Sequence, residues 1–391
     1  MRRVYFDYAA STPVDLRVYK AMEPYFTHKF GNPGSLHSFG QEAIAAVDAS
    51  RETIAKAIGA DFREIIFTGS ATEANNLALR GALAAFRAGH PGVQPKIIVS
   101  AIEHESVLDT ARAFEQDGVE IVILPVDSRG IVDFKKLKEE IDERTAIVSI
   151  IYVNNEIGTV QPIPDISKII RDFKAKRAYP LFHTDAAQAL QFLGCDVHVL
   201  GIDLMTLSAH KIYGPKGIGA LYIKESEKRG SSALLPVITG GGQEFGLRSG
   251  TENVPLIVGF AKAVELLGTH QTKAANCKKL ETLRDYFWRK LKKLAPAAEV
   301  NGGYDLSIAP HILNVYFPGR KSEEILTAGD LAGLAVSAGS ACRSRSADAS
   351  YVIQSLGHSK ARAGSSIRFS FGRWTTKLEI DAALGILKKI V

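Results

Sequence analysis

The sequence predicts an α/β protein in which a largely parallel sheet is covered by helices on both faces, together with a smaller α+β domain. Short apolar runs alternate with stretches of helical length, which is the pattern of βαβ units. The 34 glycines and the hydrophobic fraction of 46% fit many tight turns between strands and helices. The 391 residues exceed the roughly 250–300 at which a single core stops growing, so two domains are expected.

The first part of the chain supplies the expected parallel sheet. Strands are predicted for residues 64–68, 96–100, 119–124, 146–153, 180–184, 203–208 and 217–223. Between them, helices are predicted for residues 77–86, 103–115, 134–141 and 165–176. Strands and helices in this order form right-handed crossovers, which leave the connected strands parallel.

The remainder of the chain has a different pattern. Residues 254–294 have helical periodicity with one interruption near Gly268, which suggests a helix that connects two domains. Beyond it, strands are predicted for residues 311–317, 334–337 and 366–371, and helices for residues 322–331 and 378–390. We therefore expect a large domain of residues 15–260 and a small domain of residues 1–14 and 261–391.

Composition and charge argue against several classes of function. Lysine and arginine outnumber aspartate and glutamate by 48 to 42, and the net charge of +6 is not concentrated in a basic tract, so no nucleic-acid partner is expected. No run reaches the roughly 18 apolar residues of a membrane span, and the first residues resemble no signal peptide, so a cytoplasmic protein is expected. The three cysteines lack the spacing of a disulfide framework or a zinc site.

Polar residues follow the predicted strands at the ends where ligands bind in sheets of this kind. These ends carry Thr72, His104, Asn155, Asp185 and the run 208–211. Because the carboxyl ends of parallel strands meet at one edge of the sheet, the five loops predict a pocket there.

Lys211 suggests a specific chemistry. A lysine that does covalent work needs a carbonyl partner, which pyridoxal phosphate supplies, and that cofactor requires an acid opposite its ring nitrogen. Asp185, at a strand end, suits this second need. The simpler interpretations are a solvated loop lysine and an aspartate that caps a helix.

A phosphate site can be expected near the turn 69–72. This turn precedes a helix, so its backbone N–H groups and the Thr72 hydroxyl can hold a dianion. Ser208 and His210 could complete the site. Ordinary helix capping explains the same residues.

Two further residues could contact the ring of such a cofactor. His104 follows a strand and is placed to stack on a flat ring, although a hydrogen-bonded loop histidine would look the same. Gln188, three residues after Asp185, is expected on the same face of a following helical turn.

Cys342 lies in a segment of small residues, 337–346, that has no apolar shield. Only about 3% of an ordinary thiol is thiolate at pH 7, so activation by Arg343 and Arg345 would be useful. An unreactive surface cysteine is the alternative. Cys195 and Cys277 have no comparable setting and are expected to be structural.

Arg368 lies in the alternating sequence of residues 366–371, which places it on one face of a strand with two serines. An inward arginine there would anchor the carboxylate of an amino acid. The pattern fits a solvent-facing arginine equally well.

Taken together, these segments resemble the cysteine desulfurases of the NifS/IscS type, which are class-V aminotransferases of the pyridoxal-phosphate fold type I. The matching motifs are YFDYAASTP at 5–13, NNEIG at 154–158, HTDAAQ at 183–188, SAHKIYGPKG at 208–217, RSGT at 248–251, GSAC at 339–342 and SSIR at 365–368. The resemblance implies a large domain with a mostly parallel seven-stranded sheet between helices, and a smaller α+β domain. It also implies conversion of L-cysteine to L-alanine.

The resemblance also implies a role for each site residue. Lys211 would hold pyridoxal 5′-phosphate as a Schiff base, His104 would stack on its ring, and Cys342 would be the nucleophile that becomes a persulfide. Asn155 and Arg368 would orient the substrate. The other cofactor contacts would come from Ala71, Thr72, Asp185, Gln188, Ser208, His210 and, across a homodimer interface, Thr251.

The implied partners are L-cysteine, a second copy of the chain, and a sulfur acceptor or iron–sulfur scaffold protein. No resident metal is implied, and Cys342 would meet an iron–sulfur cluster only in transit. A selenocysteine lyase and a sulfur-relay protein without turnover are the alternatives. The chain departs from the family where Arg343 and Arg345 follow Cys342, where Phe245 replaces a basic residue, and where no longer tail follows the last helix.

Overall fold

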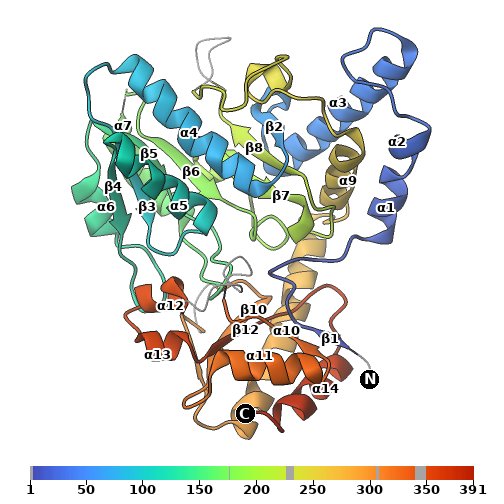
Figure 1. The fold of residues 1–391 in the computed structure, drawn as a ribbon, viewed down its shortest axis with the longest axis vertical. Helices are drawn as coiled ribbons and strands as arrows, with labels where there is room; N and C mark the ends of the chain where they lie inside the picture. The colour runs from blue at the N-terminus through green and yellow to red at the C-terminus, as the bar shows by residue number, and fades with distance from the viewer. Residues whose placement is uncertain (1–2, 176, 226–232, 305–307, 340–348) are drawn as a thin grey trace.

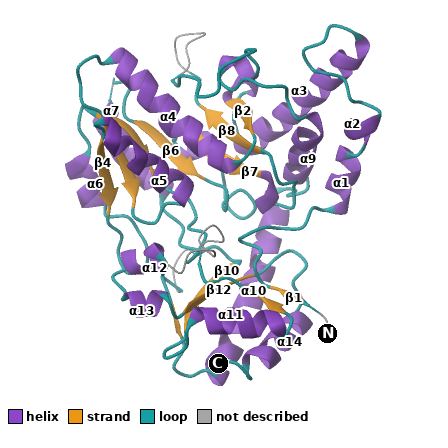
Figure 2. Ribbon diagram, in the orientation of Figure 1, coloured by secondary structure: helices purple, strands orange, loops and turns teal. Residues whose placement is uncertain are grey.

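The fold has two parts, one above the other in Figure 1. The computed structural model describes residues 3–175, 177–225, 233–304, 308–339 and 349–391. In the upper part a large sheet lies between helices, and in the lower part helices pack on a smaller sheet (Figure 2). No helix among the described residues is long and apolar enough to cross a membrane.

The upper part is built on a seven-stranded sheet in the order β2-β8-β7-β6-β5-β3-β4. Among these described strands, β8 alone runs in the direction opposite to the other six. The predicted mostly parallel sheet is therefore confirmed, and so are its seven strands. They are β2 (Ile65–Thr68), β3 (Lys96–Ser100), β4 (Glu120–Leu124), β5 (Thr145–Ser149), β6 (Leu181–Asp185), β7 (Leu204–Ser208) and β8 (Gly219–Ile223).

Helices cover both faces of this sheet because successive strand residues point to opposite sides. In β2, Ile65 and Phe67 enter one core and Ile66 enters the other. The second core is closed by α4 (Ala71–Gly89) and α5 (Glu105–Ala113). The first is closed mainly by α3 (Ser38–Ile58), α6 (Phe134–Glu140), α7 (Ile163–Lys174), α8 (Val197–Leu200) and α9 (Val254–Glu265).

Three helices precede the first strand of the large sheet, and the sequence pattern predicts none of them. They are α1 (Leu16–Met22), α2 (Pro24–Thr27) and α3. The buried face of α3 includes the small residues Gly40, Ala43 and Ser50, so its periodic apolar signal is weak. His37 caps its first turn, an uncommon choice for that position.

The lower part contains a three-stranded antiparallel sheet with the order β12-β10-β9. Its strands are β9 (Glu299–Val300), β10 (Ile312–Tyr316) and β12 (Ser366–Ser370), and beside them β1 (Val4–Tyr5) pairs with β11 (Leu334–Ala335). The helices are α11 (Ser322–Leu331), α12 (Tyr351–Ser355), α13 (Lys360–Ala363) and α14 (Lys377–Leu387).

A long helix, α10 (His270–Leu294), runs from the upper part into the lower part (Figure 1). The predicted interruption near Gly268 is confirmed, because α9 ends before this residue and its φ of 73° is left-handed. In the lower core Phe287 of α10 packs on Phe369 and Phe371. The proposed domain boundary near residue 260 stays a prediction.

The small sheet meets the carboxyl edge of the large sheet. Arg368 of β12 donates from Nη1 to the carbonyl of Asn155, in the loop after β5, at 2.8 Å. The two parts therefore touch where the sequence predicts a pocket.

Candidate active site

A cavity of about 190 Å³ lies at this junction. Its walls come from the loops after β3, β5, β6 and β7, from the start of α4 and from the N-terminal segment. Lining residues include the predicted Ala71, Thr72, His104, Asn155, Asp185, Gln188, Ser208, His210, Lys211 and Arg368.

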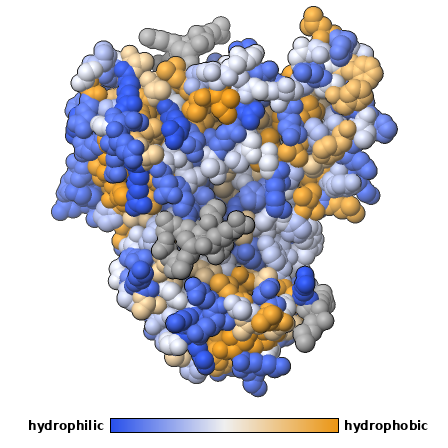
Figure 3. Space-filling view, in the orientation of Figure 1, coloured by the Kyte–Doolittle hydropathy of each residue, from blue (hydrophilic) through white to orange (hydrophobic). Residues whose placement is uncertain are grey.

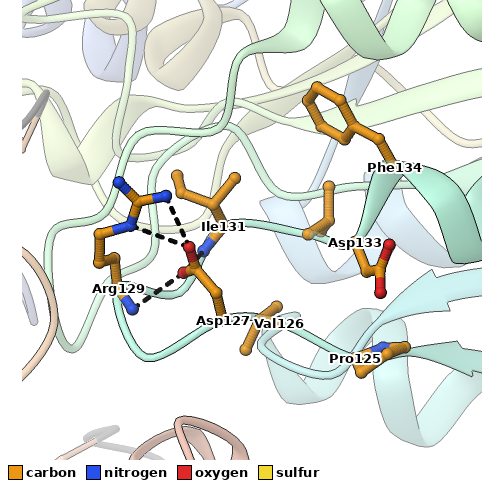
Figure 4. A pocket seen from close by; sticks show the side chains of 8 residues that line it. Pro125, Val126, Asp127, Arg129, Ile131, Asp133 and Phe134 are labelled. Carbon is orange, nitrogen blue, oxygen red and sulfur yellow. Dashed lines mark hydrogen bonds and ion pairs between the residues drawn. The ribbon is translucent and has the colours of Figure 1, made fainter.

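Two larger cavities contain none of these residues, so size alone does not identify the site. One, of about 740 Å³, is lined in part by Cys195 and Cys277, and burial raises the pKa of both thiols, that of Cys195 to about 12. Both thiols stay protonated at neutral pH, as structural cysteines would. The other, of about 340 Å³, lies between β4 and α6, where Asp127 and Arg129 pair with each other (Figure 4).

Lys211 reaches the cavity from the end of β7. A short 3-10 turn, Ala209–Lys211, follows the strand directly. Lys211 Nζ donates to the carbonyls of Ala9 and Ala10 at 2.7 and 2.8 Å. The N-terminal segment thus forms part of the site, which the sequence pattern does not reveal.

Asp185 is buried at the end of β6, and its carboxylate is held by two donors. Oδ1 accepts from the N–H of Ala187 at 2.9 Å, and Oδ2 accepts from Asn75 Nδ2 at 2.7 Å. The capping interpretation is wrong, because no helix begins in the described stretch between β6 and α8. Asn75 was not predicted, although a polar residue on the buried face of α4 was a signal for it.

His104 caps the N-terminus of α5. Its Nδ1 accepts from the backbone N–H of Ser106 at 3.1 Å and lies 2.8 Å from Ser106 Oγ. The ring orientation is therefore fixed by the helix start. This hydrogen bonding and a stacking role are compatible, since the ring also lines the cavity.

One end of the cavity is suited to a phosphate. Ala71 and Thr72 open α4, so their N–H groups have no carbonyl partner within the helix. Ser208 Oγ and His210 Nδ1 are buried and have no hydrogen-bond partner in the described part of the chain. Burial, together with nearby lysines, lowers the pKa of His210 to about 4, so its ring is neutral. These unpaired groups fit the phosphate of pyridoxal 5′-phosphate, with Lys211 and Asp185 further along the same cavity.

Gln188 lies in the cavity, but not on a helix as predicted. Residues 187–192 form consecutive turns after β6. Gln188 Nε2 donates to the carbonyl of Ala9 at 2.8 Å, and its Oε1 lies 3.3 Å from His311 Nε2. Burial lowers the pKa of His311 to about 3, so this histidine is neutral.

Arg368 lines the cavity from β12 of the small sheet. It is only 1% exposed, so the solvent-facing interpretation is wrong. Besides Asn155, its guanidinium binds Asp7 Oδ1 at 2.7 Å, while its buried Nε has no partner among the described residues. The free N–H fits the carboxylate of an amino acid. Nothing in the sequence pattern signalled Asp7.

Two predicted residues remain. Thr251 is exposed, and its expected place in the site of a second subunit stays a prediction. Cys342 lies outside the described residues, as do Arg343 and Arg345. Within the described ranges no cluster of His, Cys, Asp and Glu could hold a metal ion.

Comparisons with known proteins show which family the chain resembles. The profile of the family Aminotransferase class-V matches residues 4–383. The chain is 43% identical over 390 residues to the cysteine desulfurase IscS of Dictyoglomus turgidum, covering 100% of this chain and 95% of the relative. It is 45% identical over 385 residues to that of Rickettsia rickettsii, covering 98% and 90%.

Two solved structures have the same fold. A structure described as a NifS-like protein superposes with a TM-score of 0.89 at 36% identity and covers 99% of each chain. A structure described as SspA in complex with cysteine superposes with a TM-score of 0.81 at 36% identity, covering 95% of this chain and 100% of the other.

Proposed function

The chain belongs to the class-V aminotransferase family, and from this we propose that it is a cysteine desulfurase that uses pyridoxal 5′-phosphate. It converts L-cysteine to L-alanine and transfers the sulfur to Cys342. The observation that carries the proposal is the cavity in which Lys211, Asp185 and the unpaired Ser208 and His210 come together. The names of relatives that match nearly the whole chain support this reaction over others in the family.

The bound cofactor supplies an electron sink that makes the α-proton of the amino acid acidic. Lys211 would hold the cofactor through its amine, and the same amine would move that proton. Asp185 would pair with the ring nitrogen, while the Asn75 amide keeps the carboxylate in place. His104 would stack on the ring. The N–H groups that open α4, together with Ser208 and His210, bind the phosphate.

Substrate binding and sulfur transfer use the opposite side of the cavity. Arg368 and Asn155 orient the carboxylate of L-cysteine. The Cys342 thiolate then attacks the substrate sulfur, so that an S–S bond forms and the C–S bond breaks. The bonding electrons stay with the carbon fragment, which takes up a proton and leaves as L-alanine. Cys342 remains as a persulfide.

Turnover of labelled L-cysteine tests the proposal. We expect labelled alanine, and label on Cys342 as a persulfide that mass spectrometry can map. Cys342→Ala should abolish transfer of sulfur to an acceptor. Alanine formed by the wild type with no label on Cys342 would contradict the mechanism. The selenocysteine-lyase alternative is not favoured; it predicts selenide release that survives Cys342→Ala.

We further propose that Arg343 and Arg345 lower the pKa of Cys342. A neighbouring cation favours a thiolate, and both arginines are close to this cysteine in the sequence. The rate of Cys342 alkylation by iodoacetamide, measured against pH, reports this pKa. Replacing both arginines by alanine should shift the pH dependence of the alkylation rate to higher pH. An unchanged pH dependence would show that the arginines do not lower the pKa of Cys342.

We propose that the enzyme is a homodimer in which Thr251 completes the phosphate site of the partner. Large apolar side chains stay exposed along α1–α3, and Figure 3 shows hydrophobic surface on that side of the molecule. Leu16 is 64% exposed, Phe30 67% and Leu36 93%. Large exposed apolar side chains that gather on one side of a protein often mark an interface. Arg51 of α3 contacts Glu244 and Phe245, which links these helices to the segment that contains Thr251.

The delivery of sulfur is also part of the proposal. A sulfur-acceptor or iron–sulfur scaffold protein would take the sulfur from Cys342. A cytoplasmic location suits this chemistry, because a reducing compartment keeps Cys342 as a free thiol between turnovers.

A further inference from the structure

Asp7 is an acid beside the cavity that takes no part in the reaction described above. It lies in the N-terminal segment, two residues before Ala9, which lines the cavity. Its Oδ1 accepts a hydrogen bond from Arg368 Nη2 at 2.7 Å, and Arg368 lines the same cavity. The side chain of Asp7 is 19% exposed and that of Arg368 is 1% exposed, so the ion pair lies largely out of contact with water.

The backbone around Asp7 is held by contacts that do not involve its carboxylate. Asp7 forms a parallel bridge with Ser370, at the end of β12. The N–H of Ser370 donates to the carbonyl of Phe6 at 2.8 Å, and Ser370 Oγ accepts from the N–H of Ala9 at 2.9 Å. The carbonyl of Asp7 accepts from the Tyr5 hydroxyl at 3.0 Å. A change of the Asp7 side chain therefore leaves the course of this segment unchanged.

Within the described part of the chain, Asp7 is the carboxylate that forms an ion pair with Arg368. Nη1 of Arg368 donates to the carbonyl of Asn155 at 2.8 Å, and its buried Nε has no hydrogen-bond partner among the described residues. A guanidinium carries five N–H groups and keeps its charge in proteins. A carboxylate that binds the free N–H groups of Arg368 therefore shares one cation with the carboxylate of Asp7.

Two anions that share one cation repel each other, so Asp7 weakens the hold of Arg368 on a bound carboxylate. The substrate and the product of the proposed reaction, L-cysteine and L-alanine, carry the same α-carboxylate, so Arg368 holds both. Binding energy that is common to all bound states lowers KM without raising kcat, and it also retains the product. A weaker hold on the carboxylate therefore favours the exchange of product for substrate.

We propose that Asp7 is a positioning residue that holds Nη2 of Arg368 and, by offsetting the charge of this arginine, keeps the affinity for amino-acid carboxylates low enough for L-alanine to leave. The inference rests on the proposed function, because it takes Arg368 as the binding site of the carboxylate and L-alanine as the product. Since backbone contacts hold the N-terminal segment, the charge of Asp7 can be removed by itself.

The test measures the dissociation constant of L-alanine for the full-length enzyme loaded with cofactor, from the change in the absorption of the cofactor. Asp7→Asn keeps the shape and an acceptor oxygen but removes the charge, whereas Asp7→Glu keeps the charge. Asp15→Asn is the matched control, because Asp15 is also buried in the N-terminal segment but pairs with Arg17 and Arg373. Ethylamine, which is L-alanine without its carboxylate, is the control ligand.

We expect Asp7→Asn to bind L-alanine about tenfold more tightly than the wild type, because one nearby negative charge is lost. KM for L-cysteine should fall while kcat does not rise, and L-alanine should become a stronger inhibitor. The affinity for ethylamine should not change, and Asp7→Glu and Asp15→Asn should match the wild type. The absorption band of the bound cofactor should be the same in all variants, because Lys211 contacts backbone carbonyls of this segment.

An affinity of Asp7→Asn for L-alanine no higher than that of Asp15→Asn would overturn the proposal. Equal tightening of ethylamine would overturn it as well, since the effect would then not act on the carboxylate. If Asp7→Asn does not fold, Asp7→Ala, which also lacks the charge, takes its place in the same comparison. Failure of the proposed function looks different. In that case the wild type makes no labelled alanine from L-cysteine, yet the binding of L-alanine, which needs no turnover, still decides whether Asp7 sets the affinity for the carboxylate.

Discussion

At the scale of single residues, the site depends on buried polar groups whose partners lie in distant segments. Asp185 could be predicted from its place after a strand, but the Asn75 amide that holds it lies 110 residues earlier on another element. In the same way Lys211 was evident, whereas the carbonyls of Ala9 and Ala10 that bind it were not. Strand periodicity identifies which side chains lie at the carboxyl edge of the sheet. It does not identify which backbone atoms of other segments contact those side chains.

The Asn75 contact predicts a defect in cofactor binding. Asn75→Ala removes a hydrogen bond to a charged group, worth about 1.5–3 kcal/mol, and leaves Asp185 Oδ2 without that donor. We expect the apoprotein to bind pyridoxal 5′-phosphate at least about tenfold more weakly. Fluorescence titration measures this, with Asn76→Ala as the neighbouring control. Equal affinity of Asn75→Ala and the wild type would show that the contact is dispensable.

Glu103 predicts a particular dependence of stability on pH. Burial raises the pKa of its carboxyl to about 8, although Ser100 and the N–H of Ile151 donate to Oε1. The folded protein therefore keeps a proton that the unfolded chain releases near pH 4, so this residue lowers stability as pH rises from about 4 to 8, by up to about 1.4 kcal/mol per unit.

Glu103→Gln removes this titration while keeping the acceptor oxygen. Urea midpoints at pH 6 and pH 8 should differ less for the variant than for the wild type, with the variant relatively more stable at pH 8. If the difference in urea midpoint between the variant and the wild type is the same at both pH values, Glu103 is ionised in the folded protein at pH 6 as well as at pH 8.

At the scale of elements, the strands were predictable and several helices were not. Strands buried on both faces, such as β3 and β8, contain continuous apolar runs that stand out in the sequence. The helix α3 is rich in small residues, and the turns after Asp185 have helical spacing without forming a helix. In both cases the secondary structure is determined by packing against segments that are remote in sequence. Local periodicity carries no information about that packing.

The start of α4 predicts a linked effect on stability and cofactor binding. Ser70 Oγ accepts from the N–H of Glu73 at 3.1 Å and so fixes the first turn, on which the N–H groups of Ala71 and Thr72 depend. Ser70→Ala should lower the free energy of unfolding by about 1 kcal/mol and also weaken phosphate binding. Thr269→Ala, which removes the cap of α10, should affect stability alone. Calorimetry of the apoprotein and titration with cofactor separate the two effects.

At the scale of the whole molecule, we propose that a second subunit completes the site. The exposed apolar side chains of α1–α3 and the exposed Thr251 both suit a second subunit. Phe30→Glu with Leu36→Glu should therefore produce monomers in sedimentation experiments and weaken retention of the cofactor. Leu331→Glu is the control, since Leu331 is 83% exposed on α11. A double variant that sediments like the wild type would remove this face from the interface.

The contacts of the N-terminal segment have a consequence for the order of events during synthesis. Val4 pairs with Leu334, and the N–H of Ala9 donates to Ser370 Oγ at 2.9 Å. Val4 and Ala9 therefore wait for segments that are synthesised much later, while domains of a large chain otherwise tend to fold from the N-terminus onward. Until then the carbonyls that receive Lys211 have no fixed place. Stable capture of the cofactor is thus delayed until Ser370 has been synthesised, and a chain that stalls earlier cannot make a working site.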